Sequence, residues 1–156
     1  GRPIRYLVFG GAGFVGSHIV DQLIFRGETD ITVFDVNFTN LKHYENDKRV
    51  KFVKGDITNR EQVFAVCKGV DTVYHLASMV GYWQRLAFQY ERQHRVNVTG
   101  TLNICDACVE NGVGQLIYTS SSNVSLGYDI PTHLDMREED PYPQQPCNHY
   151  TTTKIK

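Results

Sequence analysis

The glycine-rich stretch at residues 9–16 constrains the fold of this chain more than any other part of it. It follows an apolar run at residues 4–9, which predicts a short buried strand, and it leads into a segment with the apolar period of a helix. Two glycine spacings overlap in it: Gly11-x-Gly13-x-x-Gly16 and Gly10-x-x-Gly13-x-x-Gly16. Missing side chains let the main chain approach a pyrophosphate, and a helix N-terminus offers unpaired N–H groups, so this order predicts a dinucleotide-phosphate cradle. A plain strand-to-helix turn carries the same local pattern.

Asp35 lies at the position where a dinucleotide-binding fold has an acidic residue. It ends the second predicted strand, residues 29–35, and comes 19 residues after Gly16. The dinucleotide fold places the carboxylate that binds the adenosine ribose about 20 residues after its glycines. A turn aspartate at a strand end is the ordinary alternative. No arginine or lysine lies between Thr32 and Leu41 to hold a 2′-phosphate, so we expect NAD rather than NADP.

Strand and helix patterns alternate along the chain. Apolar runs predict five strands, at residues 4–9, 29–35, 50–54, 70–76 and 115–119. Helical periods predict helices at residues 14–26, 58–69 and 84–110. The second of these begins with a capping box of Thr58 and Glu61, and the third carries the apolar stripe Val98, Leu102, Cys105 and Val109. This alternation is typical of an α/β fold, a Rossmann-like doubly wound parallel sheet with helices on both faces.

Candidate binding groups follow the carboxyl ends of the predicted strands. In a parallel sheet these ends share one edge, and ligands bind there at the point where the strand order reverses. Five groups stand in such places: residues 10–16, Asp35, Asp56, Ala77-Ser78 and Ser120–Ser122. We therefore expect one binding site at this edge of the sheet.

Two segments lie outside the alternating pattern. Residues 37–49 are polar and irregular, which predicts a loop with at most a helical turn. Residues 123–148 carry four prolines, and loops of this length are usually functional or mobile.

The last residues begin a helix in which Tyr150 and Lys154 are neighbours on one face. Taken alone, that pair is also common on the surface of helices.

Composition excludes several classes of function. The net charge is −1, whereas a nucleic-acid surface needs clustered positive charge, so no nucleic-acid partner is expected. No apolar run reaches the about 20 residues of a membrane span, and we expect no secretory signal. A cytoplasmic protein with its four cysteines unpaired is expected. The six histidines show no ligand spacing, so we expect no metal.

Seven motifs follow one another in the order of a known family. They are Gly10-Gly11-Ala12-Gly13-Phe14-Val15-Gly16, Asp35, Gly55-Asp56-Ile57, His75-Leu76-Ala77-Ser78, Val96-Asn97-Val98-Thr99-Gly100-Thr101, Tyr118-Thr119-Ser120-Ser121-Ser122-Asn123-Val124 and Tyr150-x-x-x-Lys154. With them the chain resembles the extended short-chain dehydrogenase/reductase family. The strand end at Tyr118 and the long loop before Tyr150 make it similar to the 3β-hydroxysteroid dehydrogenase-type branch.

The resemblance implies a role for each matched group. NAD would be the cofactor, and its contacts would be Gly10, Gly13, Phe14, Val15, Gly16, Asp35, Asp56, Ile57, Leu76, Ala77, Ser78, Tyr150 and Lys154. Tyr150 would be the acid/base and Lys154 its partner. Ser121 would anchor the substrate hydroxyl, although three successive serines leave Ser122 as an alternative. A free phenol has a pKa of about 10, too high for a base at neutral pH, and a nearby ammonium lowers it.

Two further polar residues have less defined roles. Asn97 would hold the backbone of its helix or a water near the site, or would be an ordinary polar helix position. His75 ends a strand and would be structural.

The resemblance implies an NAD-dependent oxidoreductase that interconverts a secondary alcohol and a ketone, with a small-molecule substrate of the 3β-hydroxysteroid or sterol-like class. A nucleotide-sugar epimerase or dehydratase of the same family and a non-catalytic NAD-binding module are the alternatives. Chains of the resembled family continue beyond the Tyr–Lys helix, so we expect residues 1–156 to form an NAD-binding Rossmann domain truncated before the substrate part of a longer enzyme. Alone it should bind NAD with little turnover. A homodimer, and membrane association through a part outside this chain, stay open.

Overall fold

The structure of the protein is a computed structural model, and the residues it describes are 1–83, 86–129 and 136–156. Internal contacts divide the chain into two compact units with these residues: 1–78 with 99–119, and 79–98 with 120–156. The first unit contains every strand of the described sheet.

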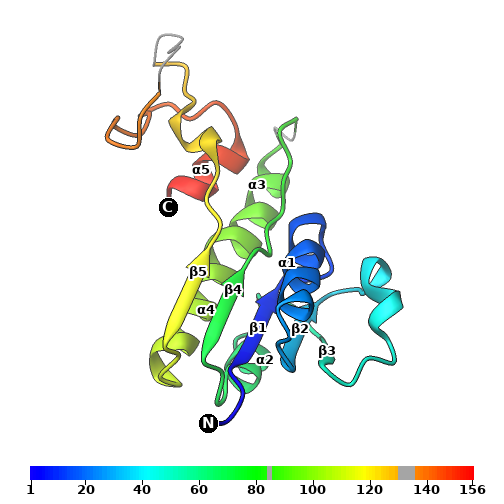
Figure 1. Ribbon diagram of the computed structural model, residues 1–156. Helices are drawn as coiled ribbons and strands as arrows, with labels where there is room; N and C mark the ends of the chain where they lie inside the picture. Colours follow the sequence, from blue (N-terminus) through cyan, green and yellow to red (C-terminus); the bar gives the residue numbers. More distant parts are fainter. Residues whose placement is uncertain (84–85, 130–135) are drawn as a thin grey trace. The chain divides into compact units, whose positions relative to one another are not determined.

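The first unit is built on a parallel sheet of five strands in the order β3-β2-β1-β4-β5 (Figure 1). The strands are β1 (Arg5–Phe9), β2 (Asp30–Asp35), β3 (Val50–Lys54), β4 (Thr72–His75) and β5 (Gln115–Tyr118). Each lies within two residues of its predicted range, and the predicted Rossmann-like α/β fold is confirmed. The strand order reverses between β1 and β4, which places the loops after these two strands where such sheets bind ligands.

Helices of the first unit cover both faces of the sheet (Figure 1). Helix α1 (Phe14–Phe25) lies on one face, and α2 (Arg60–Val66) and α4 (Thr101–Glu110) lie on the other. A buried apolar cluster includes side chains of α1 and of the strands beneath it: Tyr6, Val8, Val20, Leu23, Ile31, Val33 and Val50. Full burial of one such side chain is worth about 1.5–3 kcal/mol. The cluster therefore holds α1, and with it the glycine turn, firmly on the sheet.

The predicted capping box of Thr58 and Glu61 is wrong. Asn59 caps α2 instead, and its side chain accepts a hydrogen bond from the Gln62 N–H at 3.1 Å. Thr58 lies one residue earlier, in a turn where its own N–H donates to Asp56 Oδ1 at 2.8 Å. Since Asp56 holds Thr58 in that turn, and asparagine caps helices at least as well as threonine, the helix begins one residue later.

The long helix predicted at residues 84–110 consists of three successive elements. Helix α3 (Ala87–His94) is followed by a π-helical turn, η2 (Arg95–Gly100), and then by α4. The predicted first residue, Gln84, lies outside the described residues. A π turn bonds each N–H one residue further back than an α-helix does, so it shifts the following residues around the helix axis.

The apolar stripe predicted for this helix is wrong at two positions. Leu102 and Val109 are 57% and 83% exposed, whereas Asn103 and Ile104 are buried. Asn103 takes an inward position because its Nδ2 donates to the Ile57 carbonyl at 3.0 Å. A hydropathy period cannot find such a position, since the partner that satisfies the amide is remote in sequence.

The second unit contains α3, a 3₁₀ turn η3 (Ser122–Ser125) and the helix α5 (His149–Ile155). Helix α5 contacts both of the others. No helix in the described part of the chain combines the length and the apolar content that crossing a membrane requires.

The sequence predicts two irregular segments, residues 37–49 and 123–148. The structure describes the first in full and the second at residues 123–129 and 136–148. Residues 37–49 form a loop with a 3₁₀ turn, η1 (Thr39–Tyr44), as expected. The segment before α5 is tied to itself, because the Tyr128 N–H donates to the Gln145 carbonyl at 2.9 Å. Pro131 and His133 in that segment lie outside the described residues.

Candidate functional site

Three of the cradle glycines are required by the packing of the first unit. Gly10 has a φ of +75°, and a Cβ there would lie 2.6 Å from Ala77 N in the loop after β4. A Cβ at Gly11 would lie 2.8 Å from Val33 Cγ1. A Cβ at Gly16 would overlap the Gly10 carbonyl oxygen and lie 2.6 Å from Gly11 Cα. Glycine at these positions lets β1, the loop after β4 and α1 approach one another.

Gly13 differs because a Cβ there would approach one atom of the described residues beyond its immediate neighbours, rather than several. The nearest atom to a Cβ at Gly13 would be the Gly10 carbonyl oxygen at 3.2 Å, and the φ of −71° suits any residue. Gly13 is the N-cap of α1, and no side chain caps that helix end. Phe14 and Val15, in the first turn, are 78% and 50% exposed. The first-turn N–H groups therefore lie at an open helix end, and the space that a side chain at Gly13 would fill suits a pyrophosphate.

The carboxylate of Asp35 lies against this cradle. Its Oδ2 accepts from the Ala12 N–H at 3.0 Å, and its Oδ1 accepts from the Val36 N–H at 2.7 Å and from the Asn37 N–H at 3.4 Å. A carboxylate has about four acceptor sites, so this one keeps about one for a hydroxyl donor such as that of a ribose. No basic side chain forms an ion pair with Asp35 in the part of the chain that the structure describes. The position suits a ribose better than a phosphate.

Leu76, Ala77 and Ser78 follow β4 and run beside the cradle. The N–H groups of Leu76 and Ala77 both donate to the Phe9 carbonyl, at 2.9 and 3.0 Å. These bonds hold the loop after β4 against the end of β1. The predicted groove residues therefore lie next to Gly10, where the strand order reverses.

Asp56 and Ile57 follow β3. Asp56 is exposed, whereas Ile57 is 5% exposed and would lie 2.6 Å from a Cβ at Gly100. The structure thus places four of the five predicted groups after strand ends of the first unit: residues 10–16, Asp35, Asp56 and Ala77-Ser78. The fifth, at residues 120–122, belongs to the second unit.

Tyr150 and Lys154 lie one helical turn apart in α5 of the second unit. Asn148 caps this helix, since its Oδ1 accepts from the Thr151 N–H at 2.8 Å. Tyr150 is 6% exposed, and the Tyr82 ring meets it edge to face with the ring centroids 5.5 Å apart. Burial lowers the pKa of the Lys154 ammonium, and its electrostatic interaction with Tyr150 opposes that shift. A buried phenol interacting with a half-buried ammonium is suited to proton transfer.

Ser121 caps the 3₁₀ turn η3. Its Oγ accepts from the Asn123 N–H at 3.3 Å, and the residue is half-buried, whereas Ser122 is exposed. Because Oγ is the acceptor in this bond, the hydroxyl proton of Ser121 stays available as a donor. Ser121 as the substrate anchor, rather than Ser122, stays a prediction.

Asn97 makes contacts that sequence reasoning left undecided. It lies in the π turn η2 and is 3% exposed. Its Oδ1 accepts from the Met79 N–H at 2.7 Å, and its Nδ2 donates to the Met79 carbonyl at 2.9 Å and to Thr153 Oγ1 at 2.9 Å. Asn97 is therefore a buried structural link within the second unit, rather than an ordinary polar position. No local pattern reveals this, because both partners are remote in sequence.

His75 has the surroundings of a structural residue. It is fully buried in the first unit, with its Nε2 2.8 Å from Thr101 Oγ1 and its ring stacked on Tyr118 at a centroid distance of 5.0 Å. Within residues 1–83, 86–129 and 136–156, no three His, Cys, Asp or Glu side chains gather as metal ligands would.

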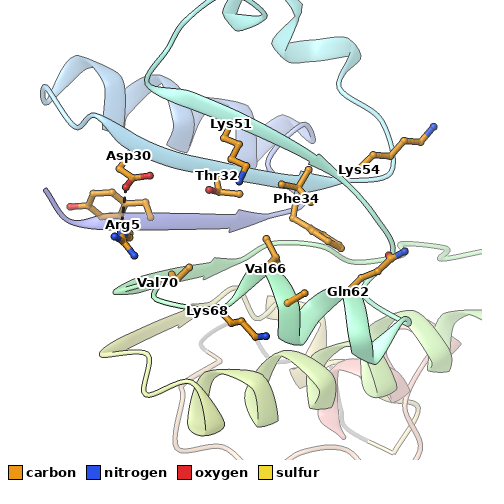
Figure 2. Close-up of a pocket in the computed structure, with 13 residues that line it drawn as sticks. Arg5, Asp30, Thr32, Phe34, Lys51, Lys54, Gln62, Val66, Lys68 and Val70 are labelled. Carbon is orange, nitrogen blue, oxygen red and sulfur yellow. Dashed lines mark ion pairs between the residues drawn. The ribbon is translucent and has the colours of Figure 1, made fainter.

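A groove of about 540 Å³ lies over the sheet face between α2 and strands β2 and β3 (Figure 2). Basic side chains around it are Arg5, Lys51, Lys54 and Lys68. Arg5 pairs with Asp30 at 3.5 Å. None of the predicted site residues lines this groove. Long basic side chains commonly cover apolar sheet surface with their stems, so the groove adds no chemistry to the cradle.

Comparison with known proteins identifies relatives over nearly the whole chain. The model of the 3-beta hydroxysteroid dehydrogenase/isomerase family matches residues 7–156. The chain is 40% identical to the sterol-4-alpha-carboxylate 3-dehydrogenase (decarboxylating) of Mus musculus, over 95% of this chain and 38% of that protein. It is 36% identical to 3 beta-hydroxysteroid dehydrogenase type 7 of Mus musculus, over 96% of this chain and 41% of that protein. The chain spans about two fifths of the length of these curated relatives.

Solved structures share the same fold. The dTDP-glucose 4,6-dehydratase of Streptomyces venezuelae, solved with NAD bound, matches with a TM-score of 0.83 and 30% identity over 97% of this chain and 48% of that one. A short-chain dehydrogenase/reductase superfamily protein of Agrobacterium tumefaciens, also with NAD, matches with a TM-score of 0.79 and 27% identity over 97% and 42%. These matches confirm the family resemblance that the sequence motifs indicate. Together with the family match over residues 7–156, they show that the chain belongs to the 3-beta hydroxysteroid dehydrogenase/isomerase family.

Proposed function

We propose that this chain carries the NAD-binding and proton-transfer groups of an oxidoreductase that interconverts a secondary alcohol and a ketone on a 3β-hydroxysteroid or sterol-like substrate. The names of its curated relatives, a sterol-4-alpha-carboxylate 3-dehydrogenase and a 3 beta-hydroxysteroid dehydrogenase, support the substrate class. The observation that carries the cofactor part is the α1 N-terminus, which no side chain caps and where, among the described residues beyond its immediate neighbours, the Gly10 carbonyl oxygen is the one atom within 4 Å of a Cβ at Gly13.

The residues of the first unit fit the adenosine and pyrophosphate parts of NAD. NAD, when bound, supplies the acceptor or donor of the hydride that leaves or joins the substrate carbon. The N–H groups at the start of α1 would hold the pyrophosphate, and the remaining acceptor site of Asp35 would take a ribose hydroxyl. The remaining proposed contacts in this unit are Gly10, Gly16, Asp56, Ile57, Leu76, Ala77 and Ser78.

Tyr150 moves the proton in this proposal. In the oxidising direction its oxygen takes the proton of the substrate hydroxyl, and in the reducing direction its hydroxyl donates that proton back. Lys154 lies one helical turn from Tyr150 and interacts with it electrostatically, so it supplies the positive charge beside the proton-transfer group. Ser121 Oγ–H donates to the substrate oxygen and holds it for both directions.

The test is turnover of the complete protein with NAD against a panel of 3-hydroxysteroids, with Tyr150→Phe as the variant. Phenylalanine keeps the ring and its packing against Tyr82 and removes the hydroxyl. We expect turnover to fall by about 10²–10⁴-fold, because that is the usual contribution of general acid–base catalysis to the rate. The Kd of NADH should stay within about twofold. Tyr142→Phe, at a residue that is 61% exposed, is the matched control. Turnover unchanged by Tyr150→Phe would contradict the proposed role.

A nucleotide-sugar epimerase or dehydratase is the second candidate. The observation that favours it is the 30% identity to a dTDP-glucose 4,6-dehydratase solved with NAD. The same panel, extended with nucleotide sugars, separates the two. Turnover of nucleotide sugars without turnover of 3-hydroxysteroids would replace the first proposal by the second.

A further inference from the structure

Both polar main-chain groups of Ala12, inside the glycine cradle, are held by side chains at the end of β2 and in the segment after it. The Ala12 N–H donates to Asp35 Oδ2 at 3.0 Å, and the Ala12 carbonyl accepts from Asn40 Nδ2 at 2.8 Å. Ala12 itself is 5% exposed. The end of β2 and the segment after it therefore hold the cradle at two points. One is Asp35, the predicted ribose acid, and the other is Asn40, which has no assigned role.

Asn40 is held in place by its own segment. It lies in η1, where the next residue, Leu41, is fully buried in the apolar cluster under α1. The end of η1 is fastened to α1, since Tyr44 Oη donates to Asp21 Oδ1 at 2.8 Å. Asn40 is itself exposed, so its side chain adds little to the core. Its main contact is the bond to the cradle.

We propose that Asn40 is a positioning residue of the cofactor site: by holding the Ala12 carbonyl, it keeps the glycine cradle in the shape that receives the pyrophosphate of NADH. This inference rests on the proposed function. A cradle bound from one side only would have to be ordered when the ligand arrives, and that ordering lowers affinity. The loss of one hydrogen bond of this kind corresponds to a change in Kd of up to about tenfold.

The test compares two variants at this position in the complete protein. Asn40→Ala removes the side-chain amide, and Asn40→Asp keeps its shape but replaces the donor by an acceptor facing the Ala12 carbonyl. Titration calorimetry measures the Kd of NADH and of ADP-ribose, which lacks the nicotinamide, and thermal unfolding gives the Tm. Asn46→Ala is the matched control, because Asn46 is exposed in the same loop.

We expect both Asn40 variants to raise the Kd of NADH and of ADP-ribose by about tenfold, with a Tm within about 2 °C of the control. The KM for NAD should rise in step while kcat stays within about twofold, since Asn40 acts on binding. A purely structural role would lower the Tm and leave the affinity of the folded protein unchanged, and that result overturns the inference. Wild-type Kd values in both variants overturn it as well. A wild-type protein that binds neither probe overturns the proposed function together with it.

Discussion

Asn97 Nδ2 donates a hydrogen bond to Thr153 Oγ1 at 2.9 Å, which links the π turn to the helix that carries Tyr150. The same side chain binds Met79 at both its N–H and its carbonyl, at 2.7 and 2.9 Å. One buried amide therefore joins three segments of the second unit. π turns often occur at functional sites, and here the turn carries the amide that meets these partners.

Asn97→Ala should destabilise the complete protein by about 2–3 kcal/mol, because it leaves the Met79 main-chain groups and the Thr153 hydroxyl without this partner. Thr153→Val removes one of the three bonds of Asn97 and also the bond from Thr153 Oγ1 to the Tyr150 carbonyl, so it should cost about 1–2 kcal/mol. Urea unfolding measures both values. The exposed Asn46→Ala serves as control and should stay within about 0.5 kcal/mol of wild type. A loss for Asn97→Ala no larger than that of the control would remove its structural role.

Gly13→Ala and Gly16→Ala should fail in different ways. A methyl group at Gly13 meets one protein atom at 3.2 Å and fills the space that suits a pyrophosphate, so this variant should fold and lose NADH binding by at least about tenfold. A methyl group at Gly16 overlaps the Gly10 carbonyl, so this variant should lose several degrees of Tm. Thermal unfolding and NADH titration of the complete protein separate the two effects. Equal NADH affinity in Gly13→Ala and wild type would place the pyrophosphate elsewhere.

The fold and the cradle were predictable because each depends on short-range pattern. Apolar runs and the glycine spacing reflect β1, the turn and α1, which are consecutive in the chain. Asp35 follows from the same logic, since one crossover of fixed length separates it from the glycines. The correct strand bounds of β3, residues 50–54, likewise come from a single apolar run.

The error in the apolar stripe arises where a partner remote in sequence decides which side chain faces inward. Asn103 faces inward because the Ile57 carbonyl accepts its amide, and this displaces the predicted stripe at Leu102 and Val109. Asn97 and Asn40 are two further amides whose partners are 18 and 28 residues away. Hydropathy treats all of these amides as surface groups. Only the folded chain shows that each one is satisfied by a specific partner.

Cofactor choice should follow the charge at the end of β2. Asp35→Ala together with Val36→Arg removes the carboxylate and adds a cation at an exposed position, so NADPH should bind more tightly and NADH more weakly than in wild type. The ratio of the two Kd values should move by at least about tenfold, since a charge-assisted hydrogen bond is worth more than a neutral one. Titration calorimetry with both cofactors measures it. Because Asp35 also accepts from the Ala12 N–H, part of the loss for NADH will come from the cradle itself. An unchanged ratio would remove Asp35 from the site.

The alkaline limb of the activity profile should report Lys154. Burial lowers the pKa of its ammonium from the ordinary 10.5, so Lys154 loses its proton at a lower pH than an exposed lysine does. The Lys154 charge beside Tyr150 is present below that pKa and lost above it, and the rate of alcohol oxidation should therefore decline before pH 10.5 is reached. Lys154→Arg keeps a charge that is not titrated in this range, so the variant should be slower at neutral pH but lack the alkaline decline. The kcat of the wild-type protein and of the variant, measured between about pH 6 and about pH 11, tests both expectations. Lys42→Arg, at an exposed residue of η1, is the matched control. A decline that persists unchanged in Lys154→Arg would assign the alkaline limb to another group.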